Sequence, residues 1–146
     1  MDAADLVRLV RETGSPYGVD PLPPVGAAVR EALQTEARGT TDFVYVPSCE
    51  SVAFDPSVLI SAVSVLQSAG VGVRVVHPSC CGALLRDRGP AAAEFREAVA
   101  EAIALADGRR VVAEAGGCAE YLGAEPFAVV AAELLESGLL RPRRVE

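Results

Sequence analysis

Apolar residues recur at helical intervals over residues 2–13, which predicts a short amphipathic helix at the start of the chain. Glycine and proline between residues 14 and 24 end this helix and favour an extended chain. A second helix is predicted over residues 25–37, ending at Arg38-Gly39. Because the apolar content of residues 1–40 is modest, we interpret them as an N-terminal helical arm or linker that lies against another part of the protein.

From residue 43 onward, short apolar runs alternate with helical patterns. The runs predict strands over residues 43–46, 71–77 and 109–113, and the helical spacing predicts helices over residues 55–70, 90–108 and 125–136. Asp55 followed by Pro56 is a strong helix start, since a carboxylate caps the first turn and proline fits it. The order β-α-β-α-β-α predicts a single three-layer α/β domain, with a short parallel sheet and right-handed crossovers, over residues 41–146.

Composition and charge exclude several classes of function. Apolar residues make up 51% of the 146 residues, yet no uninterrupted apolar run reaches eighteen residues, so we expect no membrane span. The net charge of −7 argues against a nucleic-acid partner. The first five residues are acidic where a secretory signal would be basic, so a cytoplasmic location is expected.

The four cysteines all follow predicted strands. Cys49 comes after the first strand, Cys80 and Cys81 after the second, and Cys118 after the third. Ligands of open parallel sheets collect beyond the carboxyl ends of the strands, so this topology would bring the four thiols together. Structural disulfides are not expected in a reducing compartment.

Four thiolates suit a soft metal centre, which is either a cubane iron–sulfur cluster or a zinc ion. The side chains of adjacent cysteines diverge, so Cys80 and Cys81 suit the separate iron atoms of a cluster better than one tetrahedral ion. The alternatives are four buried cysteines that act as small hydrophobic residues, or a strained disulfide between Cys80 and Cys81.

Neighbouring residues are candidates for supporting such a centre. Gly82 and Gly117 would let the backbone turn tightly beside the inorganic group and offer N–H groups to its sulfurs. His77, the single histidine, is a candidate donor to a sulfur, or else a structural residue at a strand end. Tyr121 is a candidate cover for the mouth of the site. Charged residues near the cysteines are interpreted as solvated: Glu50, Arg86, Arg88 and Glu120.

Three separated motifs resemble the cysteine-rich CCG domain of heterodisulfide reductase and of the iron–sulfur subunits of glycolate and lactate oxidases: Pro47-Ser48-Cys49, Cys80-Cys81-Gly82 and Gly117-Cys118. In that family, a cysteine, Cys-Cys-Gly and Cys-x-x-Cys are separated by about thirty and about thirty-five residues. Here 30 residues separate Cys49 from Cys80, and 35 separate Gly82 from Cys118. The segment Gly14-Ser15-Pro16-Tyr17-Gly18 is similar to one that precedes such domains, so the likeness covers residues 12–137.

The resemblance implies a [4Fe–4S] cluster held by Cys49, Cys80, Cys81 and Cys118. It implies a subunit or domain that carries electrons between a flavoprotein or ferredoxin-like oxidoreductase subunit and an acceptor, with a 2-hydroxy acid or a disulfide as the substrate class.

The chain departs from the family pattern in two ways. Tyr121 stands where a fifth cysteine would complete the set used by non-cubane clusters, and there is one such domain in place of two with a ferredoxin-like domain. A zinc-stabilised or metal-free scaffold or docking module is the alternative function.

Overall fold

Four parallel strands form one sheet in the computed structural model, which describes residues 2–18 and 41–141. The strands are β1 (Phe43–Val46), β2 (Val73–Val75), β3 (Arg110–Ala113) and β4 (Glu125–Pro126). Their order is β2-β1-β3-β4, and every neighbouring pair is parallel. The predicted parallel α/β sheet is therefore confirmed, with one strand more than the apolar runs indicated.

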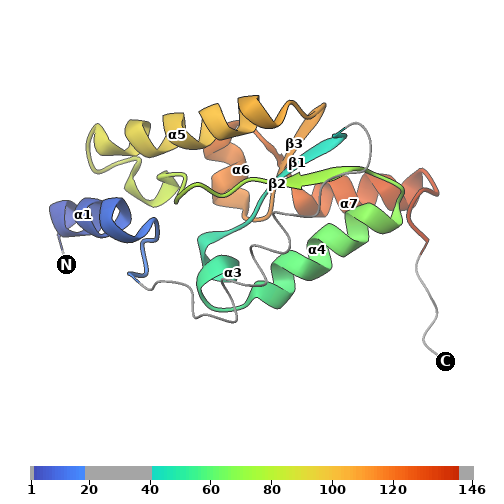
Figure 1. The fold of residues 1–146 in the computed structure, drawn as a ribbon, viewed down its shortest axis with the longest axis horizontal. Coiled ribbons are helices and arrows are strands. Elements are labelled where there is room, and N and C mark those ends of the chain that lie inside the picture. Colours follow the sequence, from blue (N-terminus) through green and yellow to red (C-terminus); the bar gives the residue numbers. More distant parts are fainter. Residues whose placement is uncertain (1, 19–40, 142–146) are drawn as a thin grey trace.

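Helices cover both faces of this sheet, as Figure 1 shows. On one face lie α4 (Pro56–Ser68) and α7 (Phe127–Glu136), and on the other lie α5 (Ala91–Ala106) and α6 (Gly116–Leu122). This arrangement confirms the three layers. Two further helices lie towards one end of the molecule: α1 (Ala3–Thr13), close to the start of α5, and the short α3 (Cys49–Ala53), directly after β1.

The strands are buried on both faces, as expected of a parallel sheet between two helical layers. Phe43 and Tyr45 of β1 pack towards α4 and α7, where they join one large core cluster. Val44 and Val46 belong to clusters that include residues of α5 and α6. This double burial explains why β1 is a continuous apolar run and not an alternating one. Among residues 2–18 and 41–141, no helix has the length and apolar character that crossing a bilayer would require.

Local signals place several helix ends where the sequence predicts them. Asp2 caps α1 through a reciprocal pair of hydrogen bonds with Asp5, and Asp55 accepts a hydrogen bond from the Ser57 N–H at the start of α4. The last helix begins two residues later than predicted, because Glu125–Pro126 pair with β3 as β4. The second strand is shorter than predicted, and α3 and α6 are additional to the predicted helices. The helix expected over residues 25–37 lies outside the described residues.

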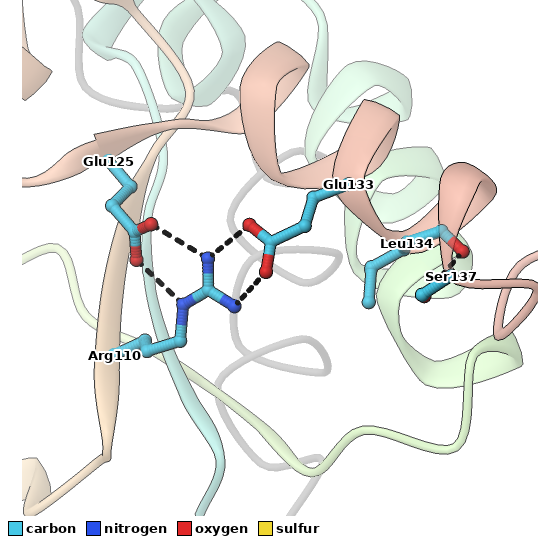
Figure 2. Close-up of polar contacts among 5 residues, drawn as sticks. All are labelled: Arg110, Glu125, Glu133, Leu134 and Ser137. Atoms are coloured by element: carbon cyan, nitrogen blue, oxygen red, sulfur yellow. Dashed lines mark hydrogen bonds and ion pairs between the residues drawn. The ribbon is translucent and has the colours of Figure 1, made fainter.

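Arg110 joins the added strand to the last helix, as drawn in Figure 2. Its guanidinium donates two hydrogen bonds of 2.7 Å to Glu125 of β4, and two of 3.0 and 2.8 Å to Glu133 of α7. It also lies 5.2 Å from the ring centroid of Phe43. These hydrogen bonds raise the pKa of Arg110 and lower the pKa values of both carboxyl groups. One side chain thus holds β3, β4 and α7 together.

Replacing Arg110 with glutamine is expected to lower the Tm by roughly 3 °C at neutral pH, because two bidentate ion pairs are lost at a partly exposed site. The carboxyl pKa values are lowered by folding, so this stabilisation is present above their unfolded values and is lost as the pH falls through the folded ones. Thermal unfolding at pH 7 and pH 3 measures the difference. The exposed neighbour Arg109, replaced with glutamine, is the control. An equal loss of Tm at pH 3 would contradict the ion-pair explanation.

Candidate metal centre

The connections of the sheet diverge at its centre. After β1 the chain continues to β2, on one side of β1, and it then crosses back to β3, on the other side of β1. The connections that follow the neighbouring strands β1 and β3 therefore lead away in opposite directions along the sheet. Crevices for ligands form at such a point, beyond the carboxyl ends of the strands. Cys49 begins α3 directly after β1, and Cys118 lies in the first turn of α6 after β3. Both residues therefore sit at this crevice.

All four cysteines line one pocket, with a cavity volume of about 190 Å³. Cys80 and Cys81, which follow β2, are each only 3% exposed, whereas Cys49 and Cys118 are half-buried. The exposed side chain of Leu84 forms part of the wall, so the pocket opens to solvent. The convergence expected from the strand ends is thus seen in the structure.

The sulfur atoms are arranged in close contacts and not around a single ion. The Sγ atoms of Cys81 and Cys118 lie 3.2 Å apart, and the Sγ of Cys49 lies 3.8 Å from the Nε2 of His77. Within residues 2–18 and 41–141, no three histidine, cysteine, aspartate or glutamate side chains are grouped in a way that would hold one metal ion. A four-thiolate zinc site would need sulfurs about 3.8 Å apart in a tetrahedron.

Hydrogen bonds among the thiols divide their pKa values into two groups. A hydrogen bond from Cys80, helped by His77 and opposed by burial, lowers the pKa of Cys49 to about 6. Hydrogen bonds from Cys118 and Cys80 lower the pKa of Cys81 to about 3. The same hydrogen bonds, together with burial, raise the pKa values of Cys80 and Cys118. These contacts favour the thiolate form of Cys49 and Cys81, and a thiolate is the form that binds metals.

The Cys-Cys-Gly turn is held in a conformation that suits glycine. Gly82 has a φ of +85°, and its N–H donates to the Sγ of Cys80 over 3.4 Å. Gly117 differs from the expectation, because it lies in the first turn of α6 and makes no comparable left-handed turn. It still lines the pocket. Tyr121 is not in the pocket wall; it packs against the core clusters behind it, with Arg96 5.2 Å from its ring centroid.

The N-terminal segment forms a wall of the pocket that the sequence did not predict. The Cys80 N–H donates a 2.8 Å hydrogen bond to the Gly14 C=O, and Val10 of α1 packs in the same cluster as Cys80. Pro16 and Tyr17 line the pocket. The Tyr17 hydroxyl donates to a Glu50 carboxylate oxygen over 2.9 Å, and burial together with this contact raises the pKa of Tyr17 to about 12. The signal in the sequence for this wall was the similarity of residues 14–18 to the segment that precedes CCG domains.

Glu114 connects two of the cysteine-bearing turns and was also not predicted. Its Oε2 accepts hydrogen bonds from the Ser48 N–H over 2.6 Å and from the Ser51 hydroxyl over 2.7 Å. Its Oε1 and the Tyr45 hydroxyl are buried and have no hydrogen-bond partner in the described residues. Burial, and then the proximity of Glu114, raises the pKa of Tyr45. The position of Glu114 directly after β3 was the signal in the sequence that could have identified it.

The remaining charged candidates lie at the surface. Arg86 and Glu120 form an exposed ion pair of 3.7 Å, which contributes little to stability. Arg88 is exposed. Comparison of the chain with known protein families, curated proteins and solved structures gives no match.

Proposed function

We propose that this protein binds a [4Fe–4S] cluster through Cys49, Cys80, Cys81 and Cys118 and serves as an electron-transfer domain or subunit of an oxidoreductase. The observation that supports this most directly is that four cysteines from three strand ends line one pocket. The motif spacing that resembles the CCG domain supports the same function. The cluster would supply one-electron transfer, which none of the chain's own side chains provides.

The pocket suits a group larger than one ion. Its volume of about 190 Å³ is far above the roughly 15 Å³ that a single water-sized particle needs. The adjacent side chains of Cys80 and Cys81 suit the separate iron atoms of a cluster better than one tetrahedral ion, which favours a cluster over zinc. Binding either centre requires the side chains of Cys81 and Cys118 to turn apart from their 3.2 Å contact.

The surrounding residues would support the cluster in ordinary ways. The backbone N–H of Gly82 already donates to the Cys80 sulfur, and His77 lies beside the sulfur of Cys49. Hydrogen bonds of this kind lower the electron density on a sulfur ligand and tune the reduction potential. Pro16 and Tyr17 shield one side of the pocket from water.

The pocket's open side is where an electron-transfer partner would approach. Leu84, which is 61% exposed, lines the pocket, and Phe54, also 61% exposed, packs against the Tyr17 ring with centroids 5.0 Å apart. An exposed apolar rim of this kind fits a transient protein contact. The proposed partner is a cytoplasmic flavoprotein or ferredoxin-like oxidoreductase subunit, which would carry the chemistry on the substrate.

Anaerobic purification, followed by measurement of iron, acid-labile sulfide, zinc and the visible spectrum, tests the cluster. We expect about four iron atoms and four sulfides per chain and a brown protein. The Cys81→Ser variant is expected to lose most of this iron, while Ser79→Ala, which leaves every thiol in place, keeps it. Zinc alone in the wild-type protein would support the scaffold function. No metal after anaerobic reconstitution would support a metal-free docking module.

A further inference from the structure

One pair of sulfur atoms in contact in the pocket joins two turns that are far apart in sequence. The Sγ atoms of Cys81 and Cys118 are 3.2 Å apart, although the residues are 37 positions apart in the chain. Cys81 is held by the turn after β2, and Cys118 by the first turn of α6. A disulfide joins sulfurs about 2.05 Å apart, so the two sulfurs would have to approach each other by about a further 1.2 Å.

The other two thiols are held in different contacts. Cys80 is buried among Val10, Leu85 and Phe95, and its Sγ accepts the Gly82 N–H. A disulfide between Cys80 and its neighbour Cys81 would also strain the backbone. Cys49 faces His77 across 3.8 Å. Cys49 also has a hydrogen-bonding contact with Cys80, so two thiol pairs meet in the pocket. The pair formed by Cys81 and Cys118, whose sulfurs lie 3.2 Å apart, is the one that joins the turn after β2 to α6.

We propose that the metal-free protein forms a disulfide between Cys81 and Cys118 when it meets hydrogen peroxide, and that this disulfide closes the pocket to metal until it is reduced. One sulfur of the pair attacks the peroxide and takes one oxygen as a sulfenic acid, and the O–O bond breaks with release of water. The second sulfur displaces that oxygen, which leaves as water with the thiol proton. Two thiols thus lose two electrons, and one hydrogen peroxide becomes two water molecules.

The linkage does not depend on the cluster, whereas the closure of the pocket to metal rests on the proposed function. The sulfur contact is present in the chain itself, whichever metal the site takes. Where a cluster is bound by all four cysteines, the pair is protected. The disulfide would therefore form only after the metal has been lost, and it would keep the empty pocket from binding another ion.

Oxidation of the full chain tests the proposal. A chelator removes any metal from the protein under reducing conditions, and the reductant is then removed. About one equivalent of hydrogen peroxide is added. The free thiols are then alkylated, and the peptides are mapped with their disulfides intact. We expect one linkage, Cys81–Cys118, with a mass loss of about 2 Da before alkylation, while Cys49 and Cys80 are alkylated. The Cys49→Ser variant should give the same linkage, and Cys118→Ser should give none. Circular dichroism checks that each variant is folded.

Other results would overturn the proposal. A dominant Cys80–Cys81 or Cys49–Cys80 linkage, or no linkage in a folded wild-type protein, would show that the 3.2 Å contact does not direct oxidation. Iron binding after oxidation, measured before and after treatment with dithiothreitol, tests the closure: we expect at least a tenfold loss that the reductant reverses. Unchanged iron binding by the disulfide form would refute the closure. A protein that never binds iron would refute the cluster while leaving the linkage to be judged on the peptide map.

Discussion

Replacing Gly82 with alanine is expected to lower the free energy of unfolding by about 3 kcal/mol, because the change adds both backbone strain and a clash. Gly82 has a φ of +85°. A Cβ at this position would lie 2.8 Å from the backbone oxygen of Ala92 and 3.2 Å from the Cβ of Phe95, and neither atom belongs to a flexible chain end. The turn that carries Cys80 and Cys81 would have to move away from α5.

Urea unfolding under anaerobic, reducing conditions measures this loss, and Gly70→Ala is a matched control. Gly70 has a φ of +81°, but a Cβ added there would meet no atom within 4 Å, so this variant carries backbone strain alone. We expect it to lose about 1 kcal/mol. If both variants lost the same amount, the close packing of the cysteine turn against α5 would have no energetic role. The Gly82 variant should also bind less iron, because its cysteine turn is displaced.

Replacing Glu114 with alanine is expected to lower the free energy of unfolding by about 2 kcal/mol, because the Ser48 N–H and the Ser51 hydroxyl lose their acceptor. Ser51 is only 5% exposed, so water replaces the carboxylate poorly. The Glu114→Gln variant keeps a carbonyl oxygen as acceptor and should lose less than about 1 kcal/mol. Chemical denaturation of the three proteins measures the difference, with exposed Glu97→Ala of α5 as the control.

The glutamine variant also separates the charge of Glu114 from its hydrogen bonds. The carboxylate lies close enough to contribute to the raised pKa of Cys118, after the larger effects of Cys81 and burial. Removing this negative charge should raise the midpoint potential of the proposed cluster, because adding an electron becomes easier. An unchanged potential in a folded variant would restrict Glu114 to holding the turns together. Loss of stability in Glu114→Gln equal to that in the alanine variant would contradict the acceptor explanation.

The sheet and its main helices could be predicted because their signals are local. The apolar run at Phe43–Val46 and the Asp55-Pro56 cap each identify an element without reference to the rest of the chain. The two-residue β4 could not be found in this way, since it depends on Arg110 holding Glu125 and Glu133 from different elements. The helices α3 and α6 are too short to show a period, so the sequence did not predict them.

In the candidate site, too, some features could be predicted from the sequence, and others depend on contacts between distant segments. The topology of a parallel sheet places strand ends together, so the meeting of Cys49 and Cys118 could be expected from the order of the strands and helices alone. The wall formed by Pro16 and Tyr17 depends on how α1 lies on the domain, which no local pattern specifies. Glu114 was missed because its role appears only once the turn at Ser48 lies beside it. The metal itself remains a prediction.

The contacts of residues 2–18 with the rest of the protein have a consequence for the order of folding. Arg11 pairs with Glu94 over 83 positions of sequence, and Tyr17 reaches Glu50 over 33. The Arg11–Glu94 pair is exposed and spans more of the chain than the pairing of Phe43 with Arg110 in the sheet, so we expect it to form after the sheet. The cysteine turns are therefore expected to take shape before their N-terminal wall arrives. During that interval the thiols face solvent on one more side, which is when a metal centre would enter most easily.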